Sequence, residues 1–178
     1  MNTSQKTVAG ASWSSTIVVA IALAGGWSAP RSWGGQPEQS QQPAALPTEP
    51  WQLNQIIKPE ELAKSLSDGA GEKPLVLYVG FPVLYRGAHI VGSRFMGPGS
   101  RPEGIQALKQ EVRDLPRDNQ VVLYCGCCPW KDCPNIRPAF RAMQELGFKN
   151  VKLLDLPRNF QQDWIAKGFP VQKGDDPR

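Results

Sequence analysis

The sequence predicts an α/β domain with one central, mainly parallel sheet flanked by helices. Two observations favour this class: short apolar runs rich in strand-forming residues alternate with amphipathic helical patterns, and the helical patterns end at Gly or Pro. The chain has 178 residues and no internal repeat, so we expect a single folded domain. Its expected extent is residues 51–178.

The first half of this domain supplies two expected strands and two expected helices. Residues 52–57 are a short strand candidate, and the helix expected over 58–69 has Pro59 in its first turn, where a proline is tolerated. A buried strand is expected over 74–80, because this run is short, apolar and rich in β-forming residues. A helix is expected over 102–116, where the apolar residues fall on one stripe.

The second half begins with a strand that leads into the cysteines. This strand is expected over 120–125, and the helix after it is located by its proline. Pro138 lacks a backbone N–H and fits only a first turn, so the helix is expected to begin near Asn135, a good N-cap, and to end at Gly147. The remaining expected elements are a strand over 149–156 and a helix over 159–168.

The first fifty residues have a different composition. An apolar stretch over residues 16–29 follows a polar start, and Ala22-Leu23-Ala24 offers a small-x-small processing site. We therefore expect an export signal or signal anchor over 1–29, and a protein that is exported to the periplasm or secreted. The stretch is shorter than the about 20 residues that span a bilayer, so membrane attachment is expected only if the segment stays uncleaved. A flexible linker rich in Pro and Gln is expected over 30–50.

The charge pattern narrows the class of partner. The net charge is +4, and the Lys and Arg residues are scattered singly rather than gathered in a basic run. Nucleic acid is therefore not an expected partner, whereas a mild positive field suits a small anionic substrate. The sequence does not predict an oligomeric state.

All four cysteines lie between the strand expected over 120–125 and the helix that follows it. Ligands of parallel sheets bind beyond the carboxyl ends of the strands, and Cys125 stands at such an end. Backbone N–H groups and the positive end of the helix dipole would lower the pKa of a thiol there and favour a reactive thiolate. The ordinary alternative is that Cys125 is a small buried hydrophobic residue.

The order of several tracts resembles the rhodanese-like (sulfurtransferase) domain family over roughly residues 55–172. The tracts are "KPEELAKSL", "GAHIVGSRF", "VVLYC" with its loop, a helix ending in "LGF", "KNVKLLDL" and "DWIAKGFPV". The resemblance implies that Cys125, which matches the catalytic cysteine, takes a sulfane sulfur from a small anionic donor as a persulfide and passes it to a thiol acceptor. No cofactor is implied, and His89 is expected to be a turn residue bonded to backbone rather than a catalytic one.

The chain also departs from the family pattern. The loop after Cys125 is expanded, and Tyr78 and Gly80 stand where an Asp-x-Arg is usual. Lys131 or Arg137 could replace the missing cation, although each could also be an ordinary surface charge. The candidate loop and substrate-binding residues are Gly126, Cys127, Cys128, Trp130, Lys131 and Arg137.

The other three cysteines leave several interpretations open. In an exported protein we expect a disulfide from Cys133 to Cys127 or Cys128, since adjacent cysteines are poorly placed to pair with each other. The same thiols could resolve an intermediate on Cys125. A thiol-disulfide oxidoreductase that uses Cys125 and Cys128 is the second interpretation of the function. A non-catalytic module, either stapled by disulfides or binding a soft metal, is the third, and no metal is expected in the preferred interpretation.

Overall fold

The computed structural model describes residues 49–68 and 72–175. The expected export segment, residues 1–29, lies outside the described residues, and so does the expected linker, 30–50, apart from Glu49 and Pro50. Among the described residues, the helices are all too short or too polar to cross a membrane.

The centre of the domain is a parallel sheet of five strands in the order β1-β6-β5-β2-β4. Strands β3 and β7 form a small antiparallel pair beside it. The predicted α/β class with a mainly parallel central sheet is therefore confirmed. The strands are β1 (Ile56–Ile57), β2 (Leu75–Tyr78), β3 (His89–Ile90), β4 (Arg94–Phe95), β5 (Val121–Tyr124), β6 (Val151–Leu154) and β7 (Val171–Gln172).

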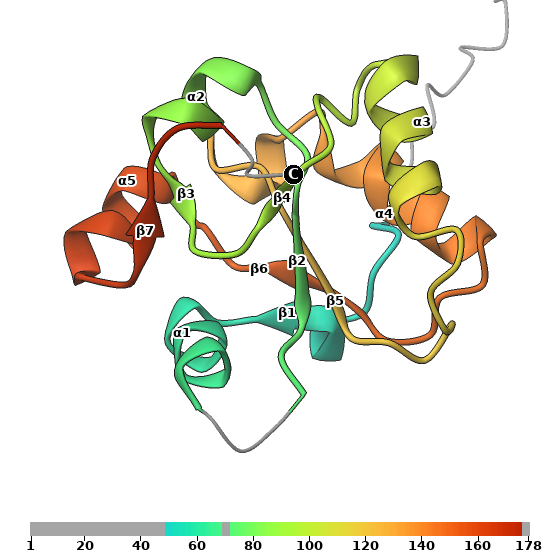
Figure 1. The fold of residues 1–178 in the computed structure, drawn as a ribbon, viewed down its shortest axis with the longest axis horizontal. Coiled ribbons are helices and arrows are strands. Elements are labelled where there is room, and N and C mark those ends of the chain that lie inside the picture. The colour runs from blue at the N-terminus through green and yellow to red at the C-terminus, as the bar shows by residue number, and fades with distance from the viewer. Residues whose placement is uncertain (1–48, 69–71, 176–178) are drawn as a thin grey trace, which may run out of the picture. The chain divides into compact units, whose positions relative to one another are not determined.

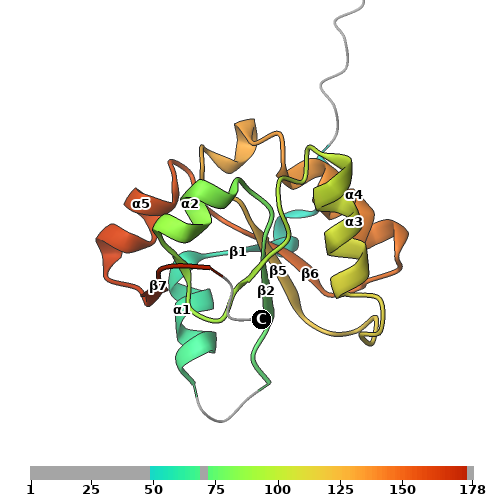
Figure 2. The same ribbon diagram turned by 45° about the horizontal axis from the view of Figure 1, so that its top comes forward.

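Helices cover both faces of this sheet. Both ribbon views show α1, α2 and α5 on one side of the strands and α3 and α4 on the other (Figures 1 and 2). The α-helices are α1 (Pro59–Ser67), α2 (Pro82–Gly87), α3 (Pro102–Glu111), α4 (Ile136–Glu145) and α5 (Phe160–Asp163). Three 3-10 turns are η1 (Leu53–Gln55), η2 (Trp130–Asp132) and η3 (Ile165–Lys167).

The hydrophobic core has two halves because strand side chains alternate between the faces of a sheet. Leu77 and Leu123 belong to the half that packs with α3 and α4. Their neighbours Tyr78 and Tyr124 belong to the half that packs with α1, α2 and α5. Every residue of β5 is buried, which is expected of the central strand of a parallel sheet covered on both faces.

Two expected elements differ from the observed ones. Residues 52–57, expected as one strand, divide into η1 and the two-residue strand β1. The helix expected over 159–168 divides into α5 and η3 at Trp164, whose φ and ψ of −125° and −62° are not helical. The indole of Trp164 is fully buried and donates a hydrogen bond to the carbonyl of Pro170 over 3.0 Å, so tertiary packing sets this break.

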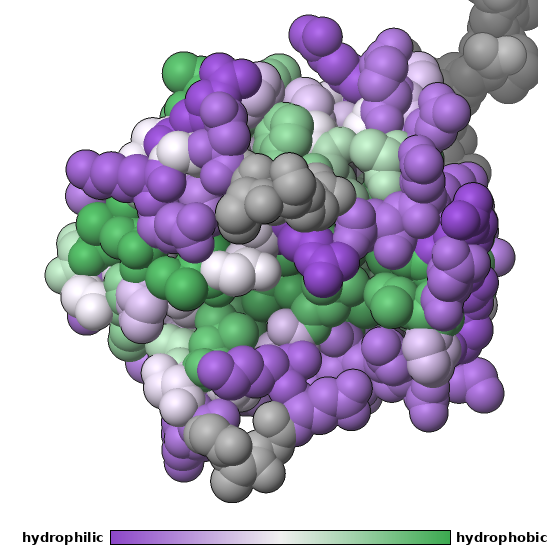
Figure 3. All heavy atoms as spheres, in the orientation of Figure 1, coloured by the Kyte–Doolittle hydropathy of each residue, from purple (hydrophilic) through white to green (hydrophobic). Residues whose placement is uncertain are grey.

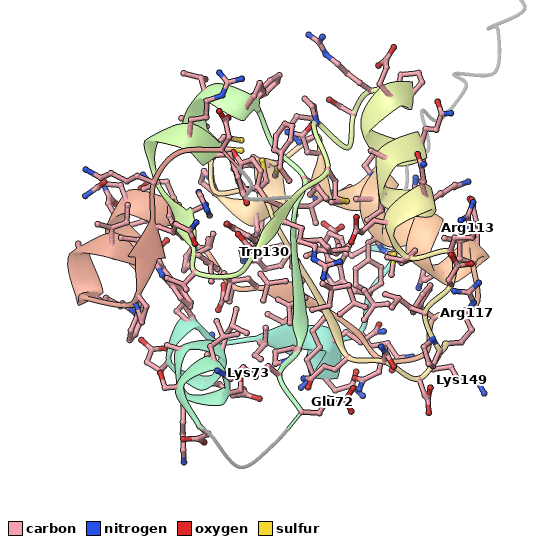
Figure 4. All side chains as sticks on the ribbon, in the orientation of Figure 1. Glu72, Lys73, Arg113, Arg117, Trp130 and Lys149 are labelled. Atoms are coloured by element: carbon pink, nitrogen blue, oxygen red, sulfur yellow. The ribbon has the colours of Figure 1, made fainter. Side chains whose placement is uncertain are left out.

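The surface separates apolar and charged groups. Figure 3 shows a band of hydrophobic residues across one face, between regions of hydrophilic ones. Exposed apolar side chains also stand at the start of α2, where Val83 is 70% and Leu84 44% exposed. Figure 4 shows Arg113, Arg117 and Lys149 together at one side of the molecule, away from Trp130.

Candidate active site

Cys125 follows β5 directly, so it lies at the carboxyl end of the central strand. Cys125 is buried, with only 3% of its surface exposed. Neighbouring strands fix the backbone here, because the N–H of Val79 donates to the carbonyl of Tyr124 over 2.9 Å. In Figure 2 the chain that follows β5 continues beyond the sheet, between the two helical layers. This is the place predicted for a ligand site in a parallel sheet.

Three of the four thiols gather at this place. The Sγ atoms of Cys125 and Cys127 are 3.3 Å apart, and the Sγ of Cys133 completes a group in which all three atoms lie within 4.8 Å of one another. Cys128 lies outside this group, although its Sγ is 3.2 Å from that of Cys127. All four cysteines are free thiols in this structure, so the expected disulfide of Cys133 stays a prediction.

The low thiol pKa of the group belongs to Cys133. Hydrogen bonds with the thiols of Cys125 and Cys127, together with the backbone N–H groups of Asn135 and Ile136, lower the pKa of Cys133 to about 3. A hydrogen bond with Cys127 lowers the pKa of Cys125, but the interaction with Cys133 and burial outweigh it and raise this pKa to about 12. The sequence predicts that the positive end of the helix dipole lowers the pKa of Cys125 instead. The expanded loop puts the thiol of Cys133 next to the backbone N–H groups at the start of α4, so this arrangement favours negative charge on Cys133.

Asn135 is a site residue that sequence reasoning treated only as a helix cap. It does occupy the N-cap position of α4, but its side chain makes no capping hydrogen bond. Its Nδ2 instead donates to the Sγ of Cys125 over 3.3 Å. The Oδ1 atom accepts from the N–H and the hydroxyl of Ser100, at 3.1 and 2.8 Å. Ser100 therefore fixes the orientation of the amide so that its donor group faces the thiol.

A pocket of about 410 Å³ opens beside Cys125 and Cys127. Its walls come from Tyr78 at the end of β2, from α2 and from the start of α5, and the residues that line it are all uncharged. Gly126 also lines it, with a φ of +79°, and a Cβ on this glycine would lie 2.7 Å from the Cβ of Phe160. The pocket therefore needs a glycine at this position, and it offers a substrate mainly apolar contacts.

The described site agrees with a comparison against protein families. A family model described as the rhodanese-like domain matches residues 58–156, more than half of the chain. The chain belongs to the rhodanese-like domain family. No match was found among curated proteins.

Solved structures give the same fold. This rhodanese-like domain is 28% identical to the thiosulfate sulfurtransferase of Pseudomonas aeruginosa, with a TM-score of 0.53 over 75% of this chain and 22% of that one. It is 20% identical to a Bacillus halodurans protein, with a TM-score of 0.51 over 66% of this chain and 76% of that one. For the rhodanese-like domain of an Anabaena protein the identity is 19% and the TM-score 0.50, over 70% and 83% of the two chains. The last two likenesses concern the fold.

In this rhodanese-like domain, the two side chains predicted to supply a cation, Lys131 and Arg137, lie away from the pocket beside Cys125. Arg137 donates from its Nε to Glu49 over 2.9 Å and from Nη1 to the carbonyl of Cys133 over 3.3 Å, so it ties the loop to the N-terminal segment. Lys131 is exposed, with its Nζ 5.6 Å from the centre of the Trp130 ring. Neither side chain lines the pocket beside Cys125.

Trp130 anchors the loop. Its Nε1 donates to Oδ1 of Asp155 over 2.8 Å, and its ring meets the edge of Trp51 at 5.7 Å between centroids. His89 lies in strand β3, not in a turn as predicted. Its Nδ1 is 2.8 Å from the carbonyl oxygen of Tyr85, so the predicted hydrogen bond to the backbone is present. Trp130 and His89 therefore support the structure around the site, and neither lines the pocket beside Cys125.

Proposed function

We propose that this domain transfers sulfane sulfur through a persulfide on Cys125. The observation that carries the proposal is the place of this thiol, at the carboxyl end of the central strand and on the wall of the 410 Å³ pocket. Members of the rhodanese family usually act on sulfur donors and thiol acceptors. Asn135 supports the same role, because its Nδ2 donor would stabilise negative charge on the sulfur of Cys125.

Two displacements make up the proposed reaction. The three thiols lie in contact, and negative charge within the group can be carried by Cys125, whose sulfur accepts a hydrogen bond from Asn135. The Cys125 thiolate attacks the sulfane sulfur of the donor, the S–S bond of the donor breaks, and the leaving group departs with the electron pair. An acceptor thiolate then attacks the outer sulfur of the persulfide, which regenerates the Cys125 thiolate.

The pocket suggests which donor reacts best. Thiosulfate carries two negative charges, and the residues that line this pocket carry no positive charge to pair with them. An organic persulfide carries at most one negative charge and could bury its apolar part against Leu84 and Phe160. We therefore propose that an organic persulfide, rather than the small anionic donor that the family resemblance implies, is the preferred donor.

The test is a pair of assays on the wild-type protein and on Cys125→Ser. With an organic persulfide as donor, the wild type is expected to gain the mass of one sulfur atom on Cys125 and to turn over when a thiol is added. The variant should lose nearly all turnover, because a hydroxyl cannot carry a sulfane sulfur, while its thermal unfolding curve shows that it still folds. If the wild type transfers no sulfur from either thiosulfate or an organic persulfide, the proposal is wrong.

A thiol-disulfide oxidoreductase is the second candidate, because a sulfur atom lies 3.3 Å from the Sγ of Cys125. That neighbour is Cys127, whereas the sequence predicts Cys128 as the resolving partner. In this alternative, a disulfide substrate incubated with Cys127→Ser should leave a stable mixed disulfide on Cys125, visible by mass spectrometry without reduction. An absence of any trapped species in both Cys127→Ser and Cys128→Ser would exclude it.

A further inference from the structure

We propose that Cys125, Cys127 and Cys133 form a binding site for one Cu(I) ion. The three Sγ atoms lie within 4.8 Å of one another, and those of Cys125 and Cys127 are 3.3 Å apart. Metal–thiolate bonds of about 2.3 Å in a planar three-coordinate arrangement separate the sulfur atoms by about 4 Å. The observed spacing brackets that separation, so small side-chain movements would complete the site.

The kinds of ligand favour Cu(I) over zinc. All three ligand atoms are thiol sulfurs, and soft thiolates select Cu(I), zinc or iron–sulfur clusters. Structural zinc sites take four ligands, but the group contains three, with Cys128 outside it. The carboxylate of Asp155 does not belong to the group and is bonded to the indole of Trp130 and the ammonium of Lys58. Three sulfurs within 4.8 Å of one another suit Cu(I), which accepts three-coordinate geometry, whereas Cys128 contacts the group from outside through Cys127.

The surroundings would stabilise the charge of such a site. One Cu(I) ion with three thiolates carries a net charge of minus two, and the displaced thiol protons leave to solvent. Asn135 donates to the Sγ of Cys125, as does the backbone N–H of Cys127. The backbone N–H groups of Asn135 and Ile136 at the start of α4 favour negative charge on Cys133. These donors are present before any ion binds, so little reorganisation is needed.

The burial of Cys125 and Cys133 would separate a bound ion from water, while the pocket leaves Cys127 accessible to an incoming ligand. Cys125 and Cys133 are 3% and 1% exposed, whereas Cys127 is half-buried and lines the 410 Å³ pocket. A small thiol carrying Cu(I) could enter this pocket and hand the ion to Cys127 first by ligand exchange. Transfer to the two buried sulfurs would follow within the group.

This inference goes beyond sulfur transfer and does not rest on it. The persulfide, the expected disulfide of Cys133 and the ion all use the same sulfur atoms, so each excludes the others. Copper-loaded protein is therefore expected to transfer no sulfur until the ion is removed. A protein without any sulfurtransferase activity could still bind the ion.

The decisive experiment is a titration of the reduced, full-length protein with Cu(I), without oxygen, in competition with a chromogenic Cu(I) chelator. We expect one ion per chain by native mass spectrometry. X-ray absorption of the loaded wild type should show three sulfur neighbours at about 2.3 Å. This spectrum needs no variant, so it stays informative even if a variant fails to fold.

Serine variants then assign the ligands. Cys125→Ser, Cys127→Ser and Cys133→Ser should each weaken binding at least about ten-fold, since even outer-shell changes cost that much. Cys128→Ser removes the thiol that contacts Cys127 from outside the group, so it is the matched control: it should keep the one-to-one stoichiometry and lose less affinity than any of the three ligand variants. The proposal is overturned by no competition with the chelator, by four sulfur neighbours, by an equal loss in Cys128→Ser, or by displacement of the ion by equimolar Zn(II).

Discussion

The side-chain amide of Asn135 connects two parts of the chain, one through its nitrogen and the other through its oxygen. Nδ2 donates to Cys125, while Oδ1 accepts from Ser100 in the turn before α3. Asn135 is fully buried, so loss of its amide leaves neighbouring polar groups without their partners. The residue therefore affects both the reactivity of the thiol and the stability of the domain.

We expect Asn135→Ala to lower the rate of sulfur transfer about ten-fold, which corresponds to one hydrogen bond of about 1.4 kcal/mol to a developing charge. Its unfolding free energy should fall by about 1–3 kcal/mol. Ser100→Ala, which keeps the bond to Cys125, is the comparison and should lose less activity than stability. Steady-state assays and urea unfolding measure the two effects. Unchanged transfer by Asn135→Ala would show that the amide does not assist Cys125.

Gly126 and Gly147 provide a matched pair of glycines with left-handed backbones, at φ of +79° and +81°. A Cβ at Gly147 meets no atom within 4 Å, whereas one at Gly126 lies 2.7 Å from Phe160. Gly147→Ala should cost about 1–2 kcal/mol from backbone strain alone. Gly126→Ala should cost about 1–3 kcal/mol more because of the clash, and should narrow the pocket. Equal losses in urea unfolding would contradict this account.

Residue-level prediction from sequence succeeded where one local pattern decided the outcome. Cys125 could be placed because a strand and a following loop locate it without tertiary information. The contact of Asn135 with Cys125 could not be predicted, because it depends on Ser100, which reaches the site from a distant part of the chain. The low pKa of Cys133 likewise depends on how the expanded loop brings this thiol to the start of α4 and to the thiols of Cys125 and Cys127.

Helix α5 is a short element whose stability depends on a buried carboxylate. Asp163 is 2% exposed, and it accepts from the N–H groups of Arg158 and Asn159 at 2.7 and 3.1 Å. Burial alone would raise the pKa of Asp163, but these bonds and the side chain of Arg158 lower it. Because α5 forms a wall of the pocket, the carboxylate also holds part of the site in place.

We expect Asp163→Asn to lower the unfolding free energy by about 2 kcal/mol at neutral pH. A lowered folded-state pKa contributes stability above the ordinary Asp value of about 4, and that contribution is lost as the pH falls through the folded value. The gap between wild type and variant should therefore shrink below about pH 4. Asp114→Asn, at an exposed pair with Arg113, is the control and should change nothing measurable. A gap that grows on acidification would contradict the assignment.

Element prediction failed for the shortest pieces. The sequence predicted nothing for α2, β3, β4 or β7, which have two to six residues each. Periodicity cannot reveal a two-residue strand, and β3 exists only because His89 and Ile90 pair with residues about eighty positions later. The omission of α2 mattered for function, because α2 supplies the wall of the pocket that carries Leu84. Longer segments with a clear pattern, such as α1 and β5, were predicted correctly.

At the scale of the whole molecule, the alternation of strands and helices was enough to predict the class. Parallel strands need crossover helices, so the order of elements along the chain nearly determines a covered parallel sheet. Two properties did not follow in the same way. The absence of a cation from the pocket wall depends on where Lys131 and Arg137 fold, and that in turn depends on Glu49, Trp51 and Trp130.

Export remains a proposal that rests on the apolar stretch at residues 16–29. We propose that the chain leaves the cytoplasm and that its N-terminus is removed between Ala24 and Ala29. N-terminal sequencing of protein from its native host should then begin within that interval. Cytoplasmic protein that still starts at Met1 would contradict the proposal.

The edge position of β1 sets an order in time. This strand is among the first parts of the domain to be synthesised, yet its partner in the sheet is β6, almost one hundred residues later. Trp51 likewise waits for Trp130 and Phe140, against which its ring packs. The start of the domain therefore stays unpaired while the ribosome makes most of the rest. Trp51 can pack on Trp130 only after the cysteine loop has been synthesised. All four thiols are therefore made before the site that buries Cys125 and Cys133 can close.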